Sequence, residues 1–254
     1  MNENDYLDDY NIVPINQFYY YDLFMQNIQE LKNAYPFLEI GNIGKSVLGK
    51  DLPYIRIGVG ERHIMYNGGI HANEWITSVL LMKFIENFCK SYVTNGSIYG
   101  KNARSLFHRV SLYIVPMLNP DTIDLVTGRL STNSQEYRNY ERISRNFPSI
   151  PFPNGWKANY RGVDLNLQFP AGWENAKRIK FEQGYNKPSP RDFVGEGPLT
   201  EPESLAIYNF TLAHNFALTI SYHTQGQEIY WNFQNINPPN GYEIGQKFAQ
   251  VSGY

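Results

Sequence analysis

The sequence has one cysteine, Cys89, so it cannot form an internal disulfide, and we expect this thiol to be a small buried apolar group. The formal net charge is only -2 and charges of both signs are interspersed, which argues against a nucleic-acid or anionic membrane partner. No apolar run approaches the roughly 18 residues that a membrane span needs. The N-terminus, MNENDYLDDY, is acidic where a secretion signal would be basic. We therefore expect a soluble protein of a reducing compartment, either the cytoplasm or the forming spore.

The 254 residues, of which 42% are hydrophobic, are enough for one large domain with a full core. Their pattern alternates between helices and strands. We expect helices at residues 24–35, 76–88 and 200–214 and strands at 38–58 (two strands around a glycine turn), 63–67, 110–118 and 217–223. Ile76, Val79, Leu80, Phe84 and Phe88 mark the middle helix as amphipathic, and Thr200 with Glu203 forms a capping box for the last. This alternation predicts an α/β fold with a parallel or mixed sheet flanked by helices, with ligand sites at the carboxyl ends of the strands.

The stretch NGGIHANEW places His71 three residues before Glu74, directly after a Gly-Gly break at the end of a predicted strand. Two residues with this spacing on a helical turn face the same side, so an imidazole nitrogen and a carboxylate oxygen can reach one metal ion. The spacing is common by chance, and a helix-start Glu beside an incidental His is the ordinary alternative. The position after a strand, where loops carry function, favours a metal site.

His223 is the candidate for a third ligand. It ends the apolar strand ALTISYH and precedes the polar loop TQGQ, whereas the other histidines have ordinary surface explanations. Two close ligands and one distant ligand, with nitrogen and carboxylate donors, are typical of a catalytic zinc ion, whereas structural zinc more often has four Cys or His ligands.

The motifs GGIHANEW, MLNPD, GVDLN and ISYHTQG occur in the order found in the zinc carboxypeptidases of the carboxypeptidase A type, which this chain resembles from about Phe18 onward. WKANYRGVDLNLQFPAGWE is similar to the bacterial branch that cleaves the γ-D-glutamyl to diamino acid (diaminopimelate) bond of peptidoglycan peptides. The resemblance implies a zinc carboxypeptidase-like (phosphorylase/hydrolase-like) fold over residues 18–254, after an N-terminal extension at 1–17. It also implies one Zn²⁺ ion bound by His71, Glu74 and His223, and substrate contact by Asn166.

Position 167 bears on the substrate. Family members that trim C-terminal residues have an arginine there, whose guanidinium binds the terminal carboxylate through two parallel hydrogen bonds. Here the residue is Leu167, which argues against ordinary C-terminal exopeptidase activity. Lys157 and Arg161 are candidates to stabilise the oxyanion, with a solvated surface cation as the alternative for each.

Two further motif residues have structural interpretations. We interpret the NPD motif at Asn119 as a turn that ends the preceding strand rather than as a catalytic element. For Asp164 we predict a hydrogen bond that orients a metal-binding imidazole.

A general base is missing from the sequence pattern. In the family it is a glutamate on a late strand, beyond the 31 residues that follow His223 here. Glu228 and Glu243 are the acids in that segment, and neither matches the family position. The resemblance therefore predicts a chain that lacks the last strand and helix of the fold, from a truncated reading frame or a shortened protein, with the base encoded after Tyr254.

Three hypotheses remain open at this stage. The chain belongs to a zinc peptidase lineage acting on cell-wall peptides, with hydrolysis impaired or absent in this chain. Alternatively, it is an inactive zinc- and peptide-binding module, or it shares only the architecture and binds no metal. A conventional metallocarboxypeptidase is a further alternative, and the sequence does not define the oligomeric state.

Overall fold

The computed structural model describes residues 11–253, so the first ten residues of the predicted extension at 1–17 lie outside the described part. The chain forms two compact units, Met1–Tyr222 and His223–Tyr254. Of the predicted extension, the described backbone amides of Ile12 and Val13 donate to the buried Glu86 carboxylate at 2.9 and 3.2 Å. The segment therefore packs against the helix that carries Glu86.

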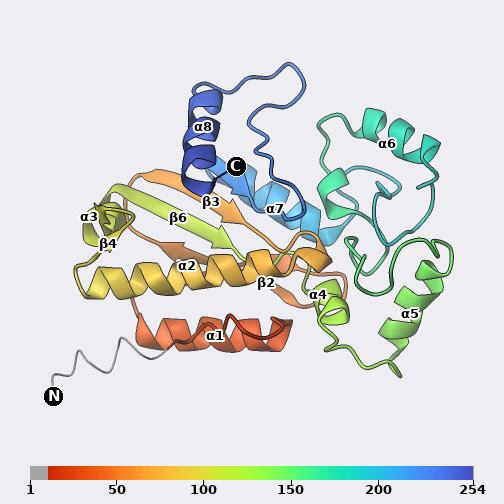
Figure 1. The fold of residues 1–254 in the computed structure, drawn as a ribbon, viewed down its shortest axis with the longest axis horizontal. Coiled ribbons are helices and arrows are strands. Elements are labelled where there is room, and N and C mark those ends of the chain that lie inside the picture. The colour runs from red at the N-terminus through yellow and green to blue at the C-terminus, as the bar shows by residue number, and fades with distance from the viewer. Residues whose placement is uncertain (1–10, 254) are drawn as a thin grey trace. The chain divides into compact units, whose positions relative to one another are not determined.

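A five-stranded mixed sheet is the centre of the first unit, in the order β1-β2-β6-β3-β7 (Figure 1). Its strands are β1 (Glu39–Lys45), β2 (Asp51–Ile57), β3 (Arg62–Asn67), β6 (Val110–Val115) and β7 (Phe216–Ser221). The pairs β1·β2 and β2·β6 are antiparallel, whereas β3 is parallel to both β6 and β7. The carboxyl ends of β3, β6 and β7 therefore meet at one edge of the sheet.

Helices cover both faces of this sheet (Figure 1). The helices of this unit are α1 (Tyr21–Ala34), α2 (Ile76–Val93), α3 (Ala103–Arg109), α4 (Pro120–Val126), α5 (Gln135–Ser144), α6 (Trp173–Glu182) and α7 (Pro202–Ala213), and α5 and α6 lie beside the sheet rather than on its faces. Single 3₁₀ turns are η2 (Ala72–Glu74) and η3 (Leu165–Leu167), and β4 (Ser97–Ile98) and β5 (Lys101–Asn102) form a small hairpin. Strand alternation explains the two layers. Ile64 and Tyr66 of β3 pack with α1 and α2, and Met65 between them packs with Ile207 of α7.

The predicted elements are largely confirmed. The helix ending before Pro36, the two strands around a glycine turn, and the strands at 63–67 and 110–118 are all present, and Cys89 is fully buried. In α2, however, Ile76 and Leu80 are 46% and 53% exposed, because the buried face is instead lined by residues such as Met82 and Ile85.

The predicted capping box is wrong. Glu201 is the N-cap of α7, and the Thr200 hydroxyl donates to Gln168 and to the Gly197 carbonyl, both at 3.1 Å. The Glu203 carboxylate accepts from the backbone amide of Val47 at 2.9 Å. A capping box would pair Thr200 with Glu203. Here the two side chains instead bind Gln168 and Val47, which are distant in sequence.

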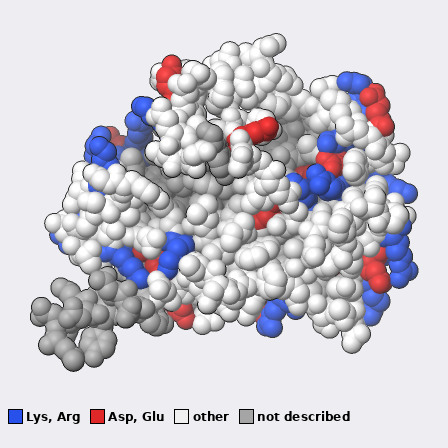
Figure 2. All heavy atoms as spheres, viewed as in Figure 1, with Lys and Arg blue, Asp and Glu red and all other residues white. Residues whose placement is uncertain are grey.

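The second unit contains α8 (Gly241–Ser252), which carries Glu243. Trp231 packs on this helix through Tyr242, with ring centroids 5.4 Å apart. Among the described residues, no helix is long and apolar enough to cross a membrane. On the face drawn in Figure 2, acidic and basic side chains are interspersed rather than gathered by sign.

Candidate metal centre

A glycine turn brings His71 to the carboxyl edge of the sheet. Strand β3 ends at Asn67, and Gly69 then adopts the left-handed conformation with φ +62°. A Cβ there would lie 2.6 Å from the Ser78 hydroxyl, so only glycine fits without displacing the start of α2. The Gly69 amide donates to the Thr77 hydroxyl at 2.9 Å, which fixes the turn against that helix.

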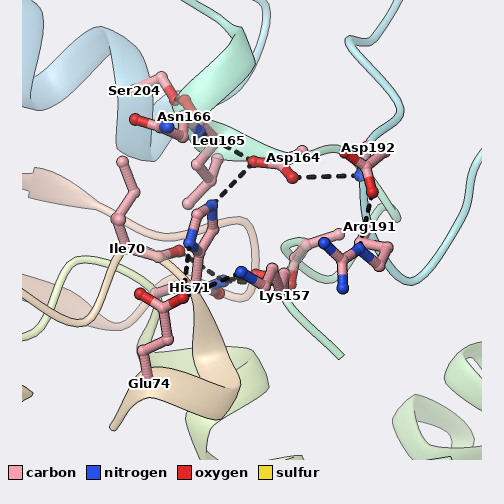
Figure 3. Close-up of polar contacts among 12 residues, drawn as sticks. Ile70, His71, Glu74, Lys157, Asp164, Leu165, Asn166, Arg191, Asp192 and Ser204 are labelled. Carbon is pink, nitrogen blue, oxygen red and sulfur yellow. Dashed lines mark hydrogen bonds and ion pairs between the residues drawn. The ribbon is translucent and has the colours of Figure 1, made fainter. Parts of the chain in front are cut away.

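His71 and Glu74 face each other in a buried position, with His71 7% and Glu74 1% exposed. The single turn η2 places His71 Nδ1 3.2 Å from Glu74 Oε1 (Figure 3). Two ligands on a tetrahedral zinc ion, each about 2.0–2.1 Å from it, are themselves about 3.3 Å apart. The spacing of this nitrogen and oxygen therefore fits two ligands of one zinc ion.

Asp164 holds the other side of the imidazole. Its Oδ1 lies 3.1 Å from His71 Nε2, so the contact predicted from the sequence is present (Figure 3). The carboxylate is itself fixed by backbone amides, because Asn166 N donates to Oδ1 at 3.2 Å and Asp192 N donates to Oδ2 at 3.1 Å. In the neutral imidazole, a proton on Nε2 shared with Asp164 leaves Nδ1 as the atom that would bind a metal ion.

The electrostatics at this imidazole favour a bound cation. Burial alone lowers the pKa of His71, but the hydrogen bonds to Asp164 and Glu74 outweigh it and raise the pKa to about 9. Burial likewise raises the pKa of Asp164, and its contact with His71 and the two amides reverses this and holds the pKa below its ordinary value. Two carboxylates around one imidazole stabilise positive charge between them, whether a proton or a metal ion supplies it.

The two oxyanion candidates lie in different surroundings. Lys157 Nζ donates to Glu74 Oε1 at 3.0 Å, with 12% of the lysine side chain exposed. Arg161 is 52% exposed and its nearest acidic partner among the described residues is Glu201, at 3.5 Å. Lys157 is therefore the candidate that contacts the His71–Glu74 pair.

Asn119 has a positioning role that the sequence interpretation missed. The NPD motif begins α4 instead of forming a simple turn, and the Asn119 amide nitrogen donates to the carbonyls of Ile70, Lys157 and Ala158 at 3.1–3.3 Å. It thus ties the segment before His71 to the segment that carries Lys157. A short turn motif carries no local signal for such distant partners.

His223 is the first residue of the second unit, one peptide bond beyond Tyr222. Tyr222 still extends the pairing of β7 with β3, because its amide donates to the Asn67 carbonyl at 2.9 Å. The chain therefore enters His223 from the same sheet edge that leads to His71. His71 and Glu74 belong to the first unit, and the role of His223 as the third ligand stays a prediction.

The remaining predicted residues are exposed. Asn166 lies in η3 and lines a cavity of about 150 Å³ with residues of β3, β7 and α7. Glu228 and Glu243 are both exposed within the second unit. The substrate role of Asn166 and the absence of a general base stay predictions.

The family is shown by comparison with known proteins. The model of the family described as zinc carboxypeptidase matches residues 24–252. Carboxypeptidase A from Helicoverpa armigera has a similar fold, with a TM-score of 0.67 at 21% identity, over 95% of this chain and 56% of that one. The chain belongs to the zinc carboxypeptidase family, whose cofactor is Zn²⁺.

Two curated relatives show what the chain is similar to within this family. The chain is 40% identical over 245 residues to γ-D-glutamyl-L-diamino acid endopeptidase 1 of Lysinibacillus sphaericus, covering 96% of this chain and 60% of the relative. Mast cell carboxypeptidase A of Mus musculus is 27% identical over 217 residues, 83% of this chain and 46% of the relative. The chain thus spans about half to three fifths of the length of these relatives.

Proposed function

We propose that the protein is a zinc metallopeptidase that hydrolyses the γ-D-glutamyl to diamino acid bond of peptides derived from peptidoglycan. The observation that carries the proposal is the buried His71–Glu74 pair, backed by Asp164, in a chain 40% identical to an endopeptidase of that name. A free diaminopimelate or a related diamino acid would be the product on the amine side.

His71, Glu74 and His223 are the residues that would hold the zinc ion. When bound, zinc supplies a Lewis acid that polarises the scissile carbonyl and makes water a stronger nucleophile near neutral pH. Asp164 keeps a proton on His71 Nε2, so that Nδ1 is the atom that would bind the metal ion, and it prevents the ring from rotating. Because both ligand side chains of the first unit are buried, bulk water cannot compete freely for them.

Lys157 is the residue we assign to the developing oxyanion. Its ammonium is held beside the site by Glu74 and is 12% exposed, so a negative charge nearby would be only weakly screened by solvent. Asn166 is assigned to substrate contact, on the resemblance of the GVDLN motif alone. Leu167, which follows it, cannot bind a terminal carboxylate, and this favours the endopeptidase over a conventional carboxypeptidase.

The test is turnover of γ-D-glutamyl-diaminopimelate by the purified protein, with an ordinary α-linked dipeptide as the control substrate. Because no residue up to Tyr254 is assigned as the general base, we expect slow cleavage of the γ-linked peptide, which a chelator abolishes and added zinc restores, with no cleavage of the α-linked peptide. The Lys157→Met variant should retain zinc while its kcat falls by about 100-fold, the loss typical for removal of one oxyanion contact.

The alternatives give different results. Zinc-dependent peptide binding without cleavage would contradict the proposal and identify a binding module. Release of the C-terminal residue from the α-linked dipeptide would indicate a conventional metallocarboxypeptidase. The absence of stoichiometric zinc would favour the hypothesis that the protein shares only the architecture of the family and binds no metal.

We also propose a cytoplasmic location, or one in the forming spore. It is supported by Cys89, which is buried and is the sole cysteine of the chain, as in proteins that do not depend on disulfides. Fractionation of the source cells with an antibody against the protein tests this, and recovery from the culture medium would contradict it.

A further inference from the structure

Arg191 lies beside the candidate metal centre, although no motif marks it. The residue before it, Pro190, accepts hydrogen bonds from the amides of Lys157 and Ala158 at 2.8 and 2.9 Å. The residue after it, Asp192, donates its amide to Asp164 at 3.1 Å. Arg191 is therefore held between the segment of the oxyanion candidate and the carboxylate that supports His71 (Figure 3).

The side chain of Arg191 lines a cavity of about 440 Å³ with an excess of positive charge. The charged residues of the lining are Lys180, Arg191 and Asp192, and the others are Ser149, Ile150, Pro151, Gly155, Gln183 and Tyr185. Asp192 pairs with both cations, because its Oδ1 lies 2.5 Å from Lys180 Nζ and its Oδ2 lies 2.7 Å from Arg191 Nε. One carboxylate against two cations leaves a formal charge of about +1 on the cavity wall.

The guanidinium of Arg191 is oriented by one hydrogen bond and has further donors that are not used. Asp192 binds only its Nε, and within the described part of the chain neither Nη atom has a hydrogen-bond partner. The side chain is 39% exposed, so the two Nη groups can be reached from the cavity. A guanidinium with its stem fixed and its outer nitrogens available matches the two oxygens of a carboxylate.

We propose that Arg191 binds a free carboxylate of the substrate and so determines specificity at this site. The inference rests on the proposed function, because a peptide joined through the γ-carboxyl of glutamate keeps the α-carboxylate of that residue free. The diamino acid supplies carboxylates on the other side of the scissile bond. Arg191 thereby provides the anion recognition that Leu167 cannot.

Binding of three peptides tests the proposal without any turnover. They are γ-D-glutamyl-diaminopimelate, its analogue with the glutamyl α-carboxylate as a carboxamide, and its analogue with the diaminopimelate carboxylates as carboxamides. Calorimetry on zinc-depleted protein gives the dissociation constants for wild type, Arg191→Gln and Arg191→Lys. Arg178→Gln is the matched control, since Arg178 is 62% exposed and pairs with Glu182 on α6, outside the cavity lining.

We expect Arg191→Gln to bind the diacid peptide about 10- to 100-fold more weakly, the effect of one charged bidentate hydrogen bond, with a smaller loss in Arg191→Lys. One of the two carboxamide analogues should bind wild type equally weakly and should not distinguish wild type from Arg191→Gln. That analogue identifies the carboxylate. Arg178→Gln should behave as wild type.

Equal affinity of wild type for all three peptides, or an equal loss in Arg191→Gln for the diacid and both analogues, would overturn the proposal in favour of a purely structural arginine. Discrimination that depends on Arg191, in a protein whose zinc-loaded form cleaves none of the peptides, would contradict the proposed function and leave the role of Arg191 standing. Cleavage of the diacid peptide without such discrimination would contradict the role of Arg191 alone.

Discussion

Asp164 and Glu203 are both buried carboxylates of the same compact unit, but their surroundings favour opposite charge states. Asp164 contacts the imidazole of His71 at 3.1 Å, and this contact holds the pKa of Asp164 below its ordinary value despite burial. Glu203 contacts only neutral donors, the Val47 amide at 2.9 Å and the Asn159 amide group at 3.2 Å. Burial, reinforced by the nearby Asp121, raises the pKa of Glu203 to about 7.

The difference separates a site built for a cation from a polar contact within the core. Burial removes water from both carboxylates, which disfavours their charged forms. Only the carboxylate beside a positively charged partner gains enough attraction to stay ionised. Beside His71, the ionised Asp164 carboxylate stabilises positive charge at the imidazole. At Glu203 the raised pKa favours the neutral acid up to about pH 7, and a neutral carboxyl group does not attract a cation.

The largest expected effect concerns the pH dependence of stability at Glu203. Its pKa in the folded protein lies above the ordinary 4.5, so its stabilising contribution is fully present below pH 4.5 and is lost as the pH rises through about 7. The loss amounts to about 3 kcal/mol of unfolding free energy. Urea unfolding from pH 4.5 to 8 should show this decline in wild type and a flatter profile in Glu203→Gln.

Glu182→Gln is the control for that experiment, because its side chain is 64% exposed on α6. It should keep the wild-type profile. Parallel profiles for wild type and Glu203→Gln would show that Glu203 ionises without cost and would remove the contrast with Asp164.

The next effect concerns Asp164. Asp164→Asn keeps the size of the side chain but removes the charge that orients and polarises His71, so zinc affinity should fall by about 10- to 100-fold. Competition with a chromophoric chelator measures this at fixed pH. Unchanged affinity in Asp164→Asn, with the fold intact by circular dichroism, would show that Asp164 only supports the loop through the amides of Asn166 and Asp192.

The smallest effect concerns Lys157, whose ammonium competes with a metal ion for Glu74. Lys157→Met should raise zinc affinity by about threefold to tenfold, because in this buried ion pair the desolvation of both groups offsets most of their attraction. The same chelator competition gives the value. A lower affinity than wild type would mean that Lys157 positions Glu74 for the metal rather than competing with it.

Much of the sheet could be predicted from sequence because its signals are local. Alternation in β2 and β3, the continuous apolar run of β6 and the glycines before His71 each act over a few residues. The His71–Glu74 spacing is of the same kind, and the structure brings the two side chains within 3.2 Å of each other.

The supporting residues could not be predicted in the same way, since their partners are far along the chain. Asn119 binds carbonyls at Ile70 and Lys157, 49 and 38 residues away. Arg191 lies beside the site only because Pro190 and Asp192 make hydrogen bonds with a segment about 30 residues earlier. Thr200 and Glu203 fit a local capping pattern and were predicted wrongly for the same reason.

The most direct test of the account is the zinc content of the purified protein, measured by elemental analysis after dialysis. We predict about one zinc ion per chain in wild type and its loss in both His71→Ala and His223→Ala. A catalytic zinc site has three protein ligands, and each of these variants removes one of them. His108→Ala, a change at an exposed histidine of α3, should retain the metal. Full zinc content in either His71→Ala or His223→Ala would contradict the proposed metal centre.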